Sequence, residues 1–149
     1  MLIVGKNRTN PFMDIGKMVK EINVGLNREA ILRKDFAPEE DLKTLYSNAK
    51  LSVYLSDYEG FGLPPLEAMA CKIPVLTTKK ASLAETVGDA AIIVENPKNI
   101  DEIAQKMEEG ITNEILRQDL IKKGLEQVKK FSWEKCAKET LDIFFKEIL

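Results

Sequence analysis

The sequence of 149 residues contains no histidine. This absence excludes every nucleophilic system that depends on an imidazole base, such as the Ser-His-Asp triad, and every zinc site with histidine ligands. It also excludes the His-Arg-Asp catalytic loop of protein kinases. Any chemistry therefore depends on carboxylates, lysines, hydroxyl groups or the backbone.

Cysteine is also scarce, and Cys71 and Cys136 form no CxxC pair. Each lies in a helical pattern beside alanines, so we expect two buried free thiols rather than a disulfide or a metal site. This usage fits a reducing compartment. We therefore expect a cytoplasmic protein.

The sequence has no excess of positive charge, because 22 basic residues face 24 acidic ones. It has no basic stripe or tail, so we expect no nucleic acid as a partner. No stretch approaches the roughly 20 apolar residues of a membrane span. The opening apolar run, residues 1–5, is too short for the core of a secretory signal. We expect membrane contact to be peripheral at most.

The apolar residues that are present follow two kinds of pattern. Short, nearly continuous apolar runs predict buried strands, and stretches with helical spacing separate them. Strands are expected at residues 1–5, 29–35, 51–56, 74–78 and 90–94, and helices at 13–26, 38–49, 63–71, 82–88 and over most of 99–149. This order predicts an α/β fold, with a Rossmann-like parallel sheet, helices on both faces and a helical C-terminal third. With 44% apolar residues, we expect residues 1–149 to form a single domain.

Polar residues mark the expected helix starts. Asn99, Asn113 and Ser132 are predicted N-caps, because their side-chain oxygens accept hydrogen bonds from free backbone amides. Ser82 and Glu85 have the spacing of a capping box. These residues fix where we expect four of the helices to begin.

The stretch EGFGLPPLEAMA, residues 59–70, places acids on both sides of two glycines and two prolines. It leads from the carboxyl end of the third expected strand into a helix, which is where ligands bind in such sheets. Gly60 and Gly62 tolerate positive φ and let the main chain approach a ligand, while free amides at the helix start favour an anion. Glu59 and Glu67 are then placed to accept hydrogen bonds from hydroxyl groups on either side of that anion. A nucleoside diphosphate sugar has this shape.

Each residue of this stretch also has an ordinary structural interpretation. Glu67 near a helix start gains roughly 0.3 to 1 kcal/mol from the helix dipole without any ligand. Glu59 in a glycine loop suits solvent, and Phe61 suits a core position. The combination of an acid, a glycine pair, a proline-started helix and a second acid favours a binding site over these separate interpretations.

The chain resembles a known family through this stretch and its surroundings. EGFGLPPLEAMACKIPV, with YSNAKLSVYLSDY before it and SLAETVGDAAIIV after it, is similar to the C-terminal donor-binding domain of retaining family 4 (group 1) glycosyltransferases. The likeness extends over nearly the whole chain and implies the glycosyltransferase-B fold. It implies transfer of a sugar from a nucleotide diphosphate to an unknown acceptor, with retention and without a metal ion or other cofactor. The absence of a DxD motif and of histidine agrees with that expectation.

The resemblance also implies roles for individual residues. Glu59 is expected to be the catalytic residue beside the donor sugar, and Glu67 to bind the ribose. The segment between them is expected to bind the donor sugar and the diphosphate through Gly60, Phe61, Gly62 and Leu63.

Three lysines depart from the family pattern. Lys72 stands where glycine is usual, and Lys79 and Lys80 lie in a loop where small polar residues are common. We expect these side chains to face solvent. The alternative is that one lysine of the loop approaches the phosphate.

The sequence also lacks parts that the full enzymes of this family have. By resemblance, these are an N-terminal acceptor domain and the first strand and helix of the donor domain, which carry an arginine and a lysine for the diphosphate. In the expected order the missing strand lies between residues 1–5 and 51–56, and its loss exposes backbone groups. We expect an incomplete donor domain. The alternatives are a fragment, a split or truncated enzyme, a dimer that repairs the sheet, or a sheet in which these two strands pair.

Three functions follow from this interpretation. The chain is the donor half of a glycosyltransferase that works with a separate N-terminal half or as a homo-oligomer, a nucleotide-sugar-binding module without catalysis, or a remnant that acts by association. A dinucleotide oxidoreductase is disfavoured, because VGKNRTN at residues 4–10 replaces the GxGxxG turn. Where a partner has been lost, we expect the last helix to be partly bare. Its apolar anchors are Phe131, Trp133, Leu141, Phe144 and Phe145.

Overall fold

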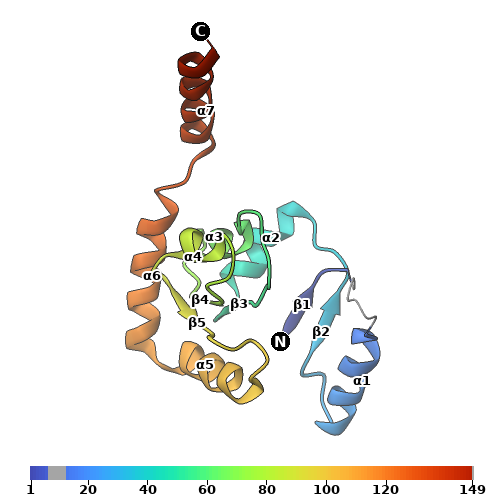
Figure 1. Cartoon of the computed structure of the whole chain (residues 1–149). Coiled ribbons are helices and arrows are strands. Elements are labelled where there is room, and N and C mark those ends of the chain that lie inside the picture. Colours follow the sequence, from blue (N-terminus) through green and yellow to red (C-terminus); the bar gives the residue numbers. More distant parts are fainter. Residues whose placement is uncertain (7–12, 149) are drawn as a thin grey trace. The chain divides into compact units, whose positions relative to one another are not determined.

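A computed structural model of the protein describes residues 1–6 and 13–148. Within it the chain divides into two compact units, Met1–Thr44 and Leu45–Leu149. Each unit contains a parallel sheet of its own together with helices (Figure 1). The predicted α/β class is therefore confirmed.

The first unit is built on a two-stranded parallel sheet. β1 (Leu2–Val4) pairs with β2 (Leu32–Lys34), so that the first residues of the two strands lie opposite each other. α1 (Ile15–Gly25) lies between these strands in the chain and contacts β2. α2 (Glu39–Ser47) begins in this unit, with three acids in its first turn, where the helix dipole favours negative charge.

The first unit has little core of its own. Ala37 is the only buried residue among its described positions, 1–6 and 13–44. Apolar side chains of both strands reach the surface, with Leu2 38% and Leu32 48% exposed. Parallel sheets are normally covered on both faces. This sheet therefore leaves apolar surface that a further layer could cover.

The second unit contains three parallel strands in the order β3-β4-β5. These are β3 (Ser52–Tyr54), β4 (Val75–Thr77) and β5 (Ala91–Ile93). β1 and β3 belong to different sheets, one in each unit. Among the described strands, β3 has β4 as its one neighbour, so its other edge is open.

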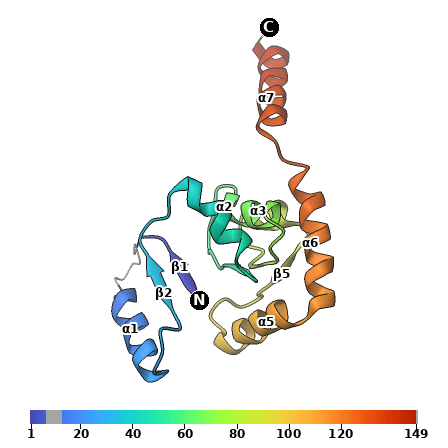
Figure 2. The same cartoon turned by 180° about the vertical axis from the view of Figure 1, so that it is seen from behind.

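Helices cover both faces of this sheet. They are α3 (Leu63–Ala70), α4 (Leu83–Val87), α5 (Ile100–Thr112) and α6 (Glu114–Val128), whereas α7 (Trp133–Ile148), which follows them in the chain, takes no part in this covering. Successive residues of a strand point to opposite faces. Val75 of β4 packs into a cluster with Leu66 and Met69 of α3, whereas Leu76 packs with Leu120 of α6. The predicted two-sided covering is present in this unit, as the helices around β5 in Figure 2 also show.

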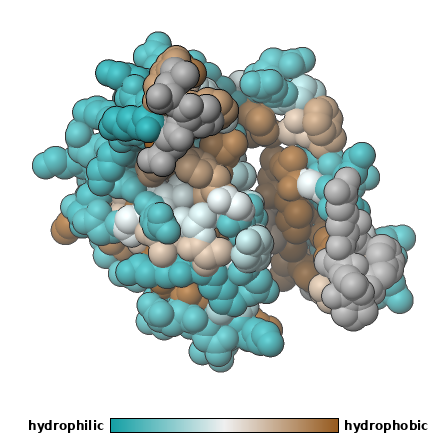
Figure 3. Space-filling model, turned by 45° about the horizontal axis from the view of Figure 1, so that its top comes forward, coloured by the Kyte–Doolittle hydropathy of each residue, from teal (hydrophilic) through white to brown (hydrophobic). Residues whose placement is uncertain are grey.

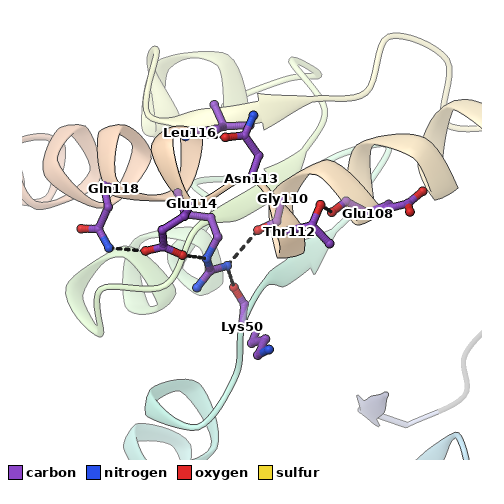
Figure 4. A network of polar contacts seen from close by, with 9 residues as sticks. Lys50, Glu108, Gly110, Thr112, Asn113, Glu114, Leu116 and Gln118 are labelled. Atoms are coloured by element: carbon purple, nitrogen blue, oxygen red, sulfur yellow. Dashed lines mark hydrogen bonds and ion pairs between the residues drawn. The ribbon is translucent and has the colours of Figure 1, made fainter.

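The corner between α5 and α6 is held by Arg117. The groups that it joins, at Lys50, Gly110 and Glu114, are labelled in Figure 4. Its guanidinium donates hydrogen bonds to the carbonyl oxygen of Lys50, just before β3, and to that of Gly110 in α5 at 2.8 Å. Its Nε lies 3.3 Å from the carboxylate of Glu114. One side chain thus ties the start of β3 to both helices.

The predicted N-caps are confirmed at Asn99, Asn113 and Ser132, where the side-chain oxygen accepts a hydrogen bond from the amide three residues later. The prediction of a capping box at Ser82 is wrong. Its hydroxyl makes no capping bond and instead donates to the carbonyl oxygen of Glu59 at 2.8 Å. A contact over 23 residues has replaced a local one.

Both cysteines are free, Cys71 partly buried and Cys136 exposed. The expected burial is wrong for Cys136, because α7 buries none of its described side chains, residues 133–146.

Figure 3 shows hydrophobic groups that reach the surface among hydrophilic ones. The last helix exposes the predicted anchors Trp133, Leu141, Phe144 and Phe145, whereas Phe131, just before it, is partly buried against the core of the second unit. Over the described ranges, no helix is both long enough and apolar enough to cross a membrane.

Candidate functional site

The predicted corner between β3 and α3 turns on one glycine. α3 starts at Leu63, after the N-cap Gly62. Gly62 has φ of 96° and ψ of 49°, in the left-handed region that favours glycine. A Cβ here would lie 2.8 Å from Cδ2 of Leu83, which is fully buried. Gly60, which is exposed, has no positive φ and so does not use the tolerance that glycine provides.

Four hydroxyl groups from β4, α4 and the loop between them hold the backbone of this corner. Each donates to a carbonyl oxygen that lies 22 to 25 residues earlier in the chain. The pairs are Thr77 to Tyr54 at 2.7 Å, Thr78 to Ser56 at 3.0 Å, Ser82 to Glu59 at 2.8 Å, and Thr86 to Phe61. We call these four pairs the hydroxyl ladder. Because they turn carbonyl groups toward β4 and α4, they fix the corner relative to the sheet.

The backbone amides of the corner stay available. Within residues 1–6 and 13–148, the amides of Gly60, Phe61, Gly62 and Leu63 donate no hydrogen bond. The two prolines that follow have no amide hydrogen to donate. The N-terminus of α3 adds the positive end of a helix dipole. The corner therefore suits an anion such as a phosphate group.

Glu59 lies partly buried in this corner. The phenol of Tyr54, at the end of β3, donates a hydrogen bond to its Oε1 at 2.6 Å. Burial raises the pKa of Tyr54 to about 12, and the hydrogen bond to Glu59 and the charge of that carboxylate add to the shift. The phenol is therefore protonated at neutral pH and acts as a donor.

Glu67 is exposed on α3, one turn into the helix. The phenol of Tyr46, in α2, donates a hydrogen bond to its Oε2 at 3.2 Å. Burial raises the pKa of Tyr46 well above its usual value, and the charge of Glu67 adds to this. The same charge also raises the pKa of Tyr54, the partner of Glu59. Both acids therefore lie within electrostatic reach of one phenol.

A hollow of about 680 Å³ adjoins the start of α3. Phe61, Leu63 and Glu67 line it together with Phe131 and Trp133. Phe61 is 46% exposed and meets the ring of Phe131 edge to face, with centroids 5.6 Å apart. Three of the predicted site residues thus share this hollow, and Phe61 is no buried core anchor. The other three predicted site residues, Glu59, Gly60 and Gly62, do not line it.

The lysines at the rim of the site either form an ion pair or are exposed to solvent. Lys80 forms an ion pair with Asp57, and its hydrogen bond lowers the pKa of that carboxyl. Lys72 and Lys79 are exposed, as predicted. Lys72 has φ of 62°, a backbone angle that glycine adopts with less strain. In the part of the chain that the structure describes, no three cysteine, aspartate or glutamate side chains lie close enough together to hold a metal ion.

Sequence reasoning does not identify Tyr46, Tyr54 or Thr86 as part of the site. Tyr46 lies 21 residues from its partner Glu67, and Thr86 lies 25 residues from Phe61, so no local spacing signals these contacts. A weak signal is present in the hydroxyl residues at the carboxyl end of β4, the edge of the sheet where ligands bind.

Comparisons with known proteins bear on these observations. The family described as "Glycosyl transferases group 1" matches residues 17–127. O-antigen chain mannosyltransferase B of Escherichia coli is 41% identical over 109 residues, which are 73% of this chain and 28% of that protein. The serotype-specific mannosyltransferase WbdA of Escherichia coli is 39% identical over 122 residues, 80% of this chain and 15% of that protein. The chain thus spans less than a third of either relative.

Solved structures share the fold. Sucrose-phosphate synthase from Thermosynechococcus elongatus matches 97% of this chain and 37% of its own, with a TM-score of 0.79 and 28% identity. TarM from S. aureus, in complex with UDP among other ligands, matches 96% of this chain and 28% of its own. Its TM-score is 0.77 and its sequence identity is 26%. The C-terminal domain of LpcC from Francisella tularensis, a glycosyl transferase group 1 family protein, matches 82% of this chain and 64% of its own. Its TM-score is 0.67 and its sequence identity is 31%.

Proposed function

Because the chain belongs to the group 1 glycosyltransferases and matches their C-terminal domain, we propose that it binds a nucleotide diphosphate sugar at the β3–α3 corner. As part of a complete enzyme it transfers the sugar, with retention and without a metal ion, to an acceptor. One observation carries this proposal. The hydroxyl ladder holds the corner so that the amides from Gly60 to Leu63 donate to no other group among the described residues.

The amides of the corner bind the phosphate end of the donor. Those of Phe61, Gly62 and Leu63 meet diphosphate oxygens at the start of α3, and Gly60 lets the loop approach the sugar. Free amides and a helix N-terminus together favour a phosphate group. TarM from S. aureus, which shares the fold, is known in complex with UDP, a nucleoside diphosphate.

The two acids bind the hydroxyl groups at either end of the diphosphate. Glu59, partly buried within the corner, accepts hydrogen bonds from the donor sugar. Glu67, exposed beside the hollow that Phe61 and Leu63 also line, accepts hydrogen bonds from the ribose. A carboxylate has two oxygens and can therefore bind both hydroxyls of a vicinal diol.

In the reaction, the bond between C1 of the sugar and the diphosphate oxygen breaks, and a bond from C1 to an acceptor oxygen forms on the same face. The departing diphosphate gains negative charge and takes up the acceptor's proton. Amides that are already in place stabilise this charge without reorganisation. Glu59 holds the sugar rather than acting as a conventional base.

An N-terminal half completes the enzyme in this proposal. The chain corresponds to 28% of O-antigen chain mannosyltransferase B, so most of such an enzyme lies outside it. The first unit exposes strand residues such as Leu2 and Leu32, and α7 exposes Trp133 and Phe144. These exposed apolar side chains are candidates for contact with the missing half.

Titration of the chain with UDP, GDP and ADP tests the proposed binding. We expect at least one of them to bind, and Glu67→Ala to weaken that binding by about tenfold to a hundredfold, because hydrogen bonds to a charged group are lost. Isothermal calorimetry measures the affinities. Glu126→Ala, which removes an exposed acid of α6, is the matched control and should bind like the parent. The proposal fails when none of the three nucleotides binds the parent chain.

A further inference from the structure

We infer that Tyr46 and Tyr54 are positioning residues that orient the two acids of the proposed site, Tyr54 acting on Glu59 and Tyr46 on Glu67. The orientation itself is independent of any ligand. Its consequence for binding and turnover rests on the proposed function. Neither tyrosine contacts a donor in this inference, so both act through the carboxylates.

The pair of Tyr54 and Glu59 is anchored at both ends. The carbonyl oxygen of Tyr54 accepts a hydrogen bond from Thr77 at 2.7 Å, and that of Glu59 accepts one from Ser82 at 2.8 Å. With both backbones held, the phenol reaches Oε1 of Glu59 at 2.6 Å. The other oxygen of Glu59 has no hydrogen-bond partner in the part of the chain that the structure describes. It is the oxygen left to accept from a hydroxyl group of a sugar.

The pair of Tyr46 and Glu67 is anchored on one side only. Tyr46 is partly buried and packs, with Ala49, against the core cluster that contains Leu66 and Met69. Its phenol reaches Oε2 of Glu67 at 3.2 Å. Glu67 itself is exposed and would otherwise rotate freely on the surface of α3. Tyr46 therefore holds one oxygen toward α2 and leaves Oε1 for a ligand.

The chemistry of the two phenols suits this role. A tyrosine hydroxyl is protonated at neutral pH and can donate, and burial, with the nearby carboxylates, raises the pKa of both hydroxyl groups further. A short hydrogen bond to a charged acceptor is stronger than one between neutral groups. A carboxylate whose rotamer is already fixed loses less entropy when a ligand binds. Preorganisation of this kind appears as ligand affinity and turnover rather than as new contacts.

Tyr58 provides a matched comparison within the same loop. It is 80% exposed, and its hydroxyl makes no hydrogen bond within residues 1–6 and 13–148. A phenylalanine at position 58 therefore removes a phenol that orients nothing. A change in stability or affinity that all three Tyr→Phe substitutions share reflects the loss of a hydroxyl group as such, and not the orientation of an acid.

The first experiment needs no nucleotide. A double-mutant cycle combines Tyr54→Phe with Glu59→Gln and measures the equilibrium constant of unfolding in urea for the full chain. We expect the two substitutions to be coupled by about tenfold, because each removes the same charged hydrogen bond. Tyr58→Phe in place of Tyr54→Phe should show no coupling to Glu59→Gln. Additive effects in the Tyr54 cycle overturn the inference for this pair.

The second experiment measures the affinity for UDP, GDP and ADP by calorimetry. Tyr46→Phe should weaken the affinity about threefold to tenfold in the parent chain and have no further effect in the Glu67→Ala variant, since the phenol acts only through that carboxylate. Tyr58→Phe should leave affinity unchanged. An equal loss in both backgrounds, or no loss in the parent, overturns the inference for Tyr46. If the parent binds no nucleotide, the proposed function fails, and the urea cycle still decides whether Tyr54 holds Glu59.

Discussion

Glu59→Gln lowers turnover by about 100-fold or more while leaving nucleotide affinity unchanged. Glutamine keeps the size of the side chain and removes the negative charge that, in the proposed function, lies beside the sugar where positive charge develops on transfer. Loss of a preorganised electrostatic contact to a reacting group typically costs a factor of about 10² to 10³ in turnover. Nucleotide affinity persists, because the diphosphate and the ribose are bound by the corner amides and Glu67 in the proposed arrangement.

The assay requires a complete enzyme. A suitable one is a chimaera in which this chain replaces the matching 28% of O-antigen chain mannosyltransferase B. Sugar transfer from the nucleotide donor gives kcat and KM, and calorimetry with the free nucleotide gives affinity. Glu109→Gln, an exposed acid of α5, is the matched control and should keep full turnover. Turnover of Glu59→Gln within twofold of the parent chimaera would show that Glu59 is not at the reacting sugar.

We expect Gly62→Ala to destabilise the second unit by about 2 to 5 kcal/mol. Alanine pays about 1 to 2 kcal/mol in the left-handed backbone region, and its Cβ would lie 2.8 Å from the buried Leu83. Forcing an extra carbon into a packed position typically costs a further 1 to 3 kcal/mol. Urea unfolding followed by circular dichroism measures the loss. Nucleotide binding should also weaken, because the amides at the start of α3 move with position 62.

Gly60→Ala serves as the control for this change. Gly60 lies two residues away, has no positive φ, and has no atom within 4 Å of the place where a Cβ would stand. Surface substitutions of this kind usually change stability by less than about 0.5 kcal/mol. Equal losses for the two alanine variants would contradict the account of the corner given above.

The order of strands and helices follows from the sequence because it depends on local periodicity. The strands at β3, β4 and β5 and the N-caps Asn99 and Asn113 are short-range features that hydrophobic pattern and side-chain chemistry determine. The corner between β3 and α3 is likewise signalled by its glycines and prolines. These parts of the structure could be predicted.

Contacts between distant residues could not be predicted in the same way. Ser82 has the spacing of a capping residue, yet its hydroxyl bonds to Glu59, 23 residues earlier. Tyr46 meets Glu67 across 21 residues. The pairing of β1 was also open, since an apolar run does not specify its neighbour, and the structure pairs it with β2. Such contacts depend on how the elements pack, which a single sequence pattern does not encode.

The roles of the site residues remain to be measured, and the amides of the corner provide the most direct test. In a ¹⁵N-labelled sample of the chain, addition of a nucleoside diphosphate should shift the amide resonances of Phe61, Gly62 and Leu63 more than those of α5 or α6, with smaller shifts in the Gly62→Ala variant. Binding that shifts other amides and leaves these three unchanged would contradict the claim that this corner receives the diphosphate.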